Sequence, residues 1–200
     1  MYYDPAEYWI KRGKIYQSNF VYNQIFRAQE KFLLNHIKGL SFNTVLEVGC
    51  GFGRITKQLL ENFPETRYTA VDLSPDQIEN AKRFVNNSKV NFAVSDIQSF
   101  SSVNKFDLVL AVEVLLHIKP EDINSTISKL LSLTNKYFVH VDWHEEITPP
   151  EYTTDSYCFM HDFDEIYSRL GLQYNKYKID GKRRLFGKID AKQAVFIVKT

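Results

Sequence analysis

The chain has 200 residues, a charged fraction of 24% and a formal net charge of +1. This length suits a single domain with its own core. The near-neutral charge gives no electrostatic reason to expect nucleic acid or an anionic membrane as a partner. Cys50 and Cys158 form no CxxC pair, which argues against a disulfide framework, and no signal peptide or membrane-spanning segment is visible. We expect a cytoplasmic protein without membrane insertion.

The opening segment, residues 1–18, is too rich in aromatic residues for a disordered tail. We interpret it either as a short helix packed on the edge of the domain or as a lid. In the lid interpretation, aromatic side chains and Arg12 close over a ligand. Apolar residues at helical spacing predict a second helix over residues 20–37, ended by Gly39. Residues 1–43 are therefore expected to form an N-terminal helical segment.

From residue 44 onwards, strand-like apolar segments alternate with segments of helical periodicity. Strands are predicted at residues 44–48, 68–72, 90–94, 106–112, 137–141, 172–179 and 194–199. Helices are predicted at residues 54–62, 74–86, 120–133 and 161–170. The alternation predicts one α/β domain with a doubly wound, mostly parallel sheet and helices on both faces. Residues 44–143 would form a ligand-binding core, and residues 144–200 a substrate-side loop, a helix and a closing hairpin.

The segment VLEVGCGFGR at residues 45–54 is the most informative part of the sequence. A buried strand leads into Gly49, Gly51 and Gly53 and then directly into a helix, which leaves backbone N–H groups open to a ligand. The glycine spacing is one residue tighter than in the G-x-G-x-x-G of a dinucleotide site. Glu47 would repel a pyrophosphate but suits a ligand with an ammonium group. We therefore disfavour a dinucleotide as the ligand.

Acidic residues follow the next two strands, where the rest of a nucleoside would lie. Asp72 ends the second predicted strand, and an acid at this place can accept both hydroxyls of a ribose. The alternative, that Asp72 is only a helix-capping acid, is disfavoured because Ser74 already fills the N-cap position. Asp96 follows the third predicted strand.

These features resemble the class I S-adenosylmethionine-dependent methyltransferases in order and in spacing. The matching residues are Glu47, Gly49, Gly51, Gly53, Asp72, Asp96, Ile97 and the segment FDLVL at 106–110. The resemblance covers roughly residues 44–142, and the order of the elements extends it to residue 200. It implies S-adenosyl-L-methionine as the cofactor. It also implies a seven-stranded sheet whose last strand is antiparallel and inserted beside the fifth.

The same resemblance implies a place for each part of the cofactor. Residues implied for the methionine moiety are Glu47, Gly49, Cys50, Gly51 and Gly53, and Asp72 is implied for the ribose. Residues implied for the adenine are Leu73, Asp96 and Ile97. Those implied for the floor beneath the sulfonium are Ala111, Val112 and Glu113. With Arg12 from the lid interpretation, these residues make up the expected cofactor site.

Few residues are catalytic candidates, because a methyl group on a sulfonium is already activated and mainly needs positioning. A general base is needed only for a hydroxyl or protonated amine acceptor. His117 is one candidate, with a packed, hydrogen-bonded histidine as the alternative. Asp142 and His144 are two others, from the period-two set that also contains His140. A metal site built from this set is disfavoured, and we expect no metal.

The expected function is methyl transfer from S-adenosyl-L-methionine to a small-molecule acceptor, such as a sugar or a lipid-linked precursor. The basis is that no appended domain for a macromolecule is visible. Candidates for the acceptor side are Tyr152 and Tyr157, in the loop at 145–159, and His161 and Asp162, just after it. No Asn-Pro-Pro-Tyr or Asp-Pro-Pro-Tyr motif follows the fourth strand, which disfavours base methylation. A protein methyltransferase and a non-catalytic, cofactor-binding partner or regulatory subunit remain alternatives, and the oligomeric state is left open.

Overall fold

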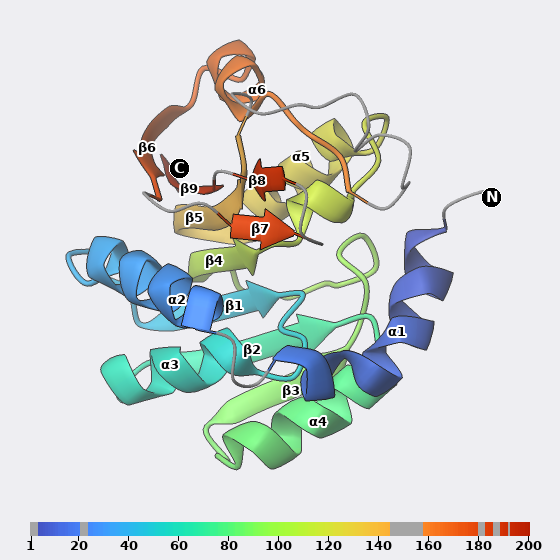
Figure 1. The fold of residues 1–200 in the computed structure, drawn as a ribbon. Helices are drawn as coiled ribbons and strands as arrows, with labels where there is room; N and C mark the ends of the chain where they lie inside the picture. The colour runs from blue at the N-terminus through green and yellow to red at the C-terminus, as the bar shows by residue number, and fades with distance from the viewer. Residues whose placement is uncertain (1–3, 21–23, 145–157, 180–182, 186–188, 192) are drawn as a thin grey trace.

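A computed structural model describes residues 4–20, 24–144, 158–179, 183–185, 189–191 and 193–200 (Figure 1). In this part of the chain, seven strands form one sheet in the order β3-β2-β1-β4-β5-β9-β6. They are β1 (Thr44–Val48), β2 (Arg67–Asp72), β3 (Val90–Val94), β4 (Phe106–Val112), β5 (Thr134–Trp143), β6 (Gln173–Lys178) and β9 (Gln193–Lys199). Strands β1 to β5 are parallel, and β9 runs antiparallel between β5 and β6. The predicted doubly wound sheet with an inserted antiparallel last strand is confirmed.

Helices cover both faces of this sheet (Figure 1). One layer contains α2 (Gln24–Ile37), α3 (Arg54–Asn62) and α4 (Pro75–Val85), and the other contains α5 (Ile123–Leu133) and α6 (Phe163–Arg169). Successive side chains of a strand point to opposite faces. In β4, Leu108 and Leu110 therefore pack into the first layer, while Val109 and Ala111 pack into the second. Both faces of the central strands are buried, as expected of a parallel sheet.

Several element boundaries differ from the sequence-based prediction. Strand β5 begins at Thr134 rather than near residue 137, and α5 begins at Ile123 rather than near residue 120. A short turn of 3₁₀-helix, η1 (Leu115–His117), follows β4 and was not predicted. A small hairpin of β7 (Arg183–Leu185) and β8 (Ile189–Ala191) lies between β6 and β9 in the sequence and was not predicted. Within the described residues, no helix has the length and apolar character needed to cross a bilayer.

The opening helix α1 (Pro5–Phe20) lies against α4, on the side to which the central strands point (Figure 1). The two helices come close at Gly13, where an added Cβ would lie 2.2 Å from the hydroxyl oxygen of Ser74. Ser74 is the N-cap of α4, and its hydroxyl accepts the N–H of Gln77 at 3.4 Å. α1 is therefore seated on the beginning of α4. Its movement as a lid stays a prediction.

Gly53 permits close packing between the start of α3 and the end of α4. Its φ is +85°, and an added Cβ would lie 2.6 Å from Cγ2 of Val85. We expect Gly53→Ala to lower the free energy of unfolding by about 2 kcal/mol or more, because backbone strain and overpacking add. Urea titration measures this loss.

Gly171→Ala is the matched control for Gly53→Ala. Gly171 also has a positive φ, +66°, but nothing lies within 4 Å of its added Cβ. Its substitution should therefore cost only the backbone strain, about 1 kcal/mol. Equal losses in the two variants would show that the contact with Val85 carries no weight.

Candidate functional site

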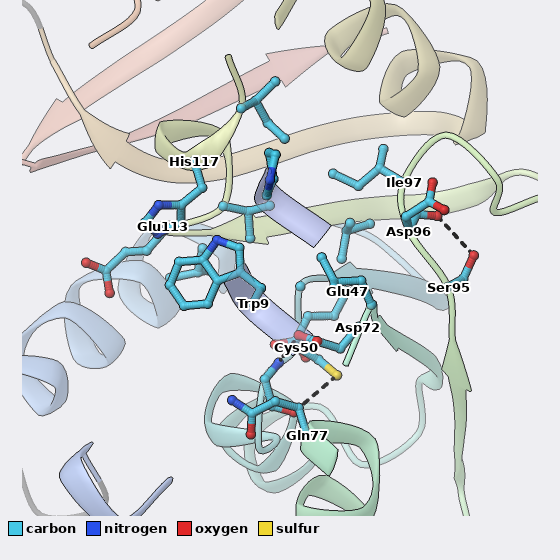
Figure 2. Close-up of a pocket in the computed structure, with 18 of the residues that line it drawn as sticks. Trp9, Glu47, Cys50, Asp72, Gln77, Ser95, Asp96, Ile97, Glu113 and His117 are labelled. Carbon is cyan, nitrogen blue, oxygen red and sulfur yellow. Dashed lines mark hydrogen bonds between the residues drawn. The ribbon is translucent and has the colours of Figure 1, made fainter. Parts of the chain in front are cut away.

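A pocket lies at the carboxyl ends of β1, β2, β3 and β4, where open α/β sheets bind their ligands (Figure 2). Its walls come from the glycine loop after β1, from the residues that follow β2, β3 and β4, and from the first turns of α1. The expected cofactor residues that line it are Glu47, Gly49, Cys50, Gly51, Asp72, Leu73, Asp96, Ile97, Val112 and Glu113. The catalytic candidate His117 also lines it.

The other expected residues within the described part of the chain are not part of this lining. Gly53 packs against α4, and Ala111 is fully buried in the second layer of the core. Arg12 lies on α1 with its guanidinium carbon 5.9 Å from the centre of the Tyr8 ring. Asp142 and His144 are buried at the end of β5. Tyr152 and Tyr157 lie outside the described residues.

Asp72 holds the glycine loop against the start of α4. Its Oδ2 accepts the N–H of Gly51 at 2.9 Å, and its Oδ1 accepts the N–H of Ser74 at 2.8 Å. Burial raises the pKa of Asp72, and the two N–H groups partly offset this effect. At Gly51 an added Cβ would meet only Nε2 of Gln77, at 3.8 Å, so the loop presents bare backbone to the pocket. The carboxylate of Asp72 suits a ribose, and the bare loop beside it lets a ligand approach the backbone closely.

Glu47 is a buried carboxyl group in the same pocket. Only 4% of its surface is exposed, and its Oε2 accepts the hydroxyl of Thr56 at 2.6 Å. Burial raises the pKa of Glu47 to about 7, although the hydrogen bond from Thr56 and the charge of Arg54 lower it. A buried carboxylate is costly unless a cation is beside it. The site therefore favours a ligand with a positively charged group.

Asp96 and Glu113 lie at opposite ends of the pocket (Figure 2). Asp96 is exposed, and its Oδ1 accepts the N–H of Ser99 at 2.8 Å. Ile97, next to it, and Leu73 add apolar surface to this end of the lining. A carboxylate beside apolar side chains suits an aromatic base with an amino group.

The turn η1, which carries His117, is fixed from two sides. The N–H of Leu116 is accepted by Oδ1 of Asp142 at 3.1 Å. Nε2 of His161 lies 3.0 Å from the carbonyl oxygens of both Leu115 and Ile118. Because carbonyl oxygens only accept hydrogen bonds, this nitrogen of His161 carries the proton. The backbone after β4 is thus held in one conformation.

Behind this turn lies a buried polar group that the sequence had offered as a catalytic or metal-binding set. His140 contacts Oδ2 of Asp142 through Nδ1 at 2.9 Å and the hydroxyl of Tyr167 through Nε2 at 2.7 Å. Burial lowers the pKa of His140 to about 3 and raises that of Asp142 well above its usual range, so burial favours the neutral form of each group. Among the described residues, no cluster of three or more potential ligands is arranged to hold a metal ion. The geometry gives Asp142 a supporting position behind η1.

His117 faces the pocket between two groups from distant parts of the chain. The centre of its ring lies 4.4 Å from that of Trp9 on α1, and its Nδ1 lies 3.7 Å from Sγ of Cys158. Burial raises the pKa of Cys158 to about 12, so its thiol keeps its proton at neutral pH. Sequence reasoning missed Cys158 because no local pattern links it to a residue so far away in the chain.

The sequence comparisons concern the part of the chain that carries the glycine loop. The family model described as "Methyltransferase domain" matches residues 45–136. Malonyl-[acyl-carrier protein] O-methyltransferase of Acetivibrio thermocellus is 39% identical over 87 residues, which cover 44% of this chain and 30% of that protein. Nodulation protein S of Rhizobium tropici is 36% identical over 93 residues, which cover 46% of this chain and 38% of that protein. The match thus spans about a third of each of these relatives.

Solved structures share the fold over nearly the whole chain. The N-methyltransferase NodS of Bradyrhizobium japonicum WM9, in complex with S-adenosyl-L-homocysteine, gives a TM-score of 0.76 at 17% identity. The match covers 98% of this chain and 99% of that one. Magnesium protoporphyrin IX methyltransferase of Synechocystis PCC 6803, with bound S-adenosylmethionine, gives 0.73 at 14% identity, with coverage of 99% and 98%.

The fold and the pocket define a nucleoside-binding domain of the Rossmann-like α/β class. Residues 45–136, which contain the glycine loop and the acids that follow it, match the methyltransferase-domain model and are similar to methyltransferases.

Because the pKa of Glu47 is raised in the folded chain, this residue lowers the free energy of unfolding at high pH and much less at low pH. Above pH 7 the buried group is charged in the folded chain, and below its ordinary pKa of 4.5 it is protonated whether the chain is folded or not. We expect Glu47→Gln to raise the free energy of unfolding of the ligand-free protein at pH 8 by roughly 2 kcal/mol, and by much less at pH 5. Urea titrations at the two pH values measure the gain.

Thr56→Val is the matched variant for this experiment. It removes the hydroxyl that donates to Glu47 while keeping a branched side chain of similar shape. It should destabilise the protein more at pH 8 than at pH 5, because only the charged carboxylate depends strongly on that donor. A loss of stability in Glu47→Gln at pH 8 would contradict the assignment of a costly buried charge.

The neutral state of Asp142 predicts a difference between two substitutions. Asparagine keeps an acceptor for the N–H of Leu116 and a donor toward Nδ1 of His140, whereas alanine leaves both without a partner. We expect Asp142→Asn to change the free energy of unfolding by less than about 1 kcal/mol and Asp142→Ala to lower it by about 3 kcal/mol. If both variants lose the same amount in denaturant titrations, Asp142 is charged in the fold.

Proposed function

We propose that the chain is a methyltransferase that transfers a methyl group from S-adenosyl-L-methionine to a small-molecule acceptor. The observation that carries this proposal is the convergence of three carboxylates, Glu47, Asp72 and Asp96, from three strand ends onto one pocket beside an open glycine loop. Each carboxylate suits a different hydrogen-bonding group of that cofactor. The matched family and the relatives named as methyltransferases support it.

The chain's residues would hold the cofactor along the length of the pocket. Glu47 would accept the ammonium group, and the backbone at Gly51 would allow the methionine moiety to lie close. Asp72 would accept the ribose hydroxyls, and Asp96 the amino group of the adenine. When bound, S-adenosyl-L-methionine supplies a methyl group that its sulfonium already activates. The protein's remaining task is to orient the acceptor and to exclude water.

The residues after β4 and on α1 are the ones placed for that task. Trp9, Val112 and Ile118 give this part of the lining apolar surface. Of the three catalytic candidates, His117 lines the pocket, and we assign it as the group that accepts a proton from the acceptor. Asp142 would act as a positioning residue through the N–H of Leu116. His144 stays a candidate on the sequence alone.

Fewer observations bear on the acceptor than on the cofactor. A sugar or a lipid-linked precursor would reach the pocket beside α1 and η1, but a protein acceptor would use the same surface. A non-catalytic partner would bind the cofactor without turnover. Formation of S-adenosyl-L-homocysteine in the presence of candidate acceptors separates an enzyme from such a binding subunit.

Cofactor affinity tests the proposal directly. We expect S-adenosyl-L-methionine and S-adenosyl-L-homocysteine to raise the melting temperature and NAD to leave it unchanged. Asp72→Asn should weaken cofactor binding in calorimetry by more than about 1 kcal/mol, since a neutral amide replaces a charged acceptor of hydrogen bonds. Asp76→Asn, which neutralises an acid in the first turn of α4 outside the pocket lining, is the control. Stabilisation by NAD alone would overturn the proposal.

A further inference from the structure

Gln77, in the first turn of α4, is a buried glutamine that lines the pocket. Only 5% of its surface is exposed, and its side-chain Oε1 has no hydrogen-bond partner among the described residues. A buried polar atom without a partner lowers stability, and native proteins keep few of them. The side chain of Gln77 therefore points to a role that the folded chain alone does not fulfil.

The sequence places Gln77 three residues after the N-cap Ser74, which is the spacing of a capping box. In a capping box, the side chain of the later residue accepts the backbone N–H of the N-cap residue. Here the N–H of Ser74 is donated instead to Oδ1 of Asp72, at 2.8 Å. The other half of the box is present, since the hydroxyl of Ser74 accepts the N–H of Gln77 at 3.4 Å. Because Asp72 has taken the usual partner of the Gln77 side chain, that side chain is not used as a cap.

The other end of the Gln77 amide faces the glycine loop. An added Cβ at Gly51 would meet only Nε2 of Gln77, at 3.8 Å. The N–H of the same glycine donates to Oδ2 of Asp72 at 2.9 Å. Gln77 and Asp72 thus flank Gly51, and both lie beside Cys50 in the pocket (Figure 2). The negative charge of Asp72 favours the orientation in which the NH₂ group, the positive end of the amide dipole, faces this space.

Helix α1 packs against the stem of the Gln77 side chain. An added Cβ at Gly13 would lie 3.2 Å from Cγ of Gln77. In such close packing the amide has little room to turn away from the glycine loop. The donor at Nε2 is therefore in place before a ligand binds, which reduces the entropy lost on binding.

We propose that Gln77 and Asp72 together recognise a ribose hydroxyl of the cofactor, with Gln77 as the donor and Asp72 as the acceptor. This inference rests on the proposed function, since it assigns a further residue to the same pocket. A hydroxyl both donates and accepts hydrogen bonds, whereas a carboxylate only accepts and an amide NH₂ group only donates. A ligand carboxylate at this place would offer Asp72 no proton and would meet its charge. Gln77 is thus a specificity-determining residue that favours a ribose over a deoxyribose.

Calorimetry with three ligands tests this assignment: S-adenosyl-L-homocysteine and its analogues with a 2′-deoxyribose or a 3′-deoxyribose. Gln77→Met keeps the length of the side chain and removes the donor. We expect it to weaken the binding of S-adenosyl-L-homocysteine by about fivefold or more. For the analogue that lacks the recognised hydroxyl, the same substitution should change the affinity by less than about twofold. The ligand-free variant should melt no lower than the wild-type protein, because it loses a buried acceptor without a partner.

Gln77→Glu is a second variant, which keeps the shape of the side chain and the capping-box pattern but replaces the donor by an acceptor. It should weaken S-adenosyl-L-homocysteine at least as much as Gln77→Met does, because it also brings like charge toward Asp72. Gln58→Met is the matched control. Gln58 lies on α3 outside the pocket lining, with its Nε2 donating to Glu61 at 3.4 Å, and its substitution should leave all three affinities unchanged.

The inference is overturned if both Gln77 variants bind S-adenosyl-L-homocysteine as tightly as the wild-type protein does. It is also overturned if Gln77→Met weakens all three ligands equally, because Gln77 would then contact a part of the ligand other than these two hydroxyls. Failure of the wild-type protein to bind S-adenosyl-L-homocysteine would instead refute the proposed function.

Discussion

The pocket depends above all on the half-buried carboxylate of Asp72. One of its oxygens holds the N–H of Gly51 in the loop after β1, and the other holds the N–H of Ser74 at the start of α4. Ser74 in turn caps α4 and forms the surface on which Gly13 of α1 rests. Three segments of the pocket wall thus take their positions from one side chain. Two N–H donors offset part of the cost of burying it, and a ligand with hydroxyl groups would offset more.

The opposite wall is held in a different way. There the turn η1 rests on Asp142 and His161, and Asp142 belongs to a buried group with His140 and Tyr167. Burial keeps the Asp142 and His140 pair neutral, so it needs no counter-ion and adds no charge to the pocket. Asp72 presents a charged group to the ligand, whereas Asp142 and His161 hold the backbone of η1 in place.

Features encoded locally in the sequence were predicted well. The glycine spacing, the period-two strands and the N-cap at Ser74 depend on neighbouring residues, and they gave the sheet and most of the pocket lining. The start of β5 was missed because its residues Thr134, Asn135 and Lys136 are polar. The period-two spacing predicted that His140, Asp142 and His144 share a face of the strand, but it could not predict how deeply these side chains are buried. The link between Glu113 and Gln193 joins residues 80 positions apart, which no local pattern indicates.

The two cysteines of the chain lie at the pocket, Cys50 in its lining and Cys158 against His117. Both are buried, and burial raises the pKa of each thiol, so almost none of either is thiolate at neutral pH. The thiolate is the form that reacts with alkylating reagents. Modification therefore requires the residues around each cysteine to move apart. The rate of alkylation therefore measures how often the pocket opens, with no label added to the protein.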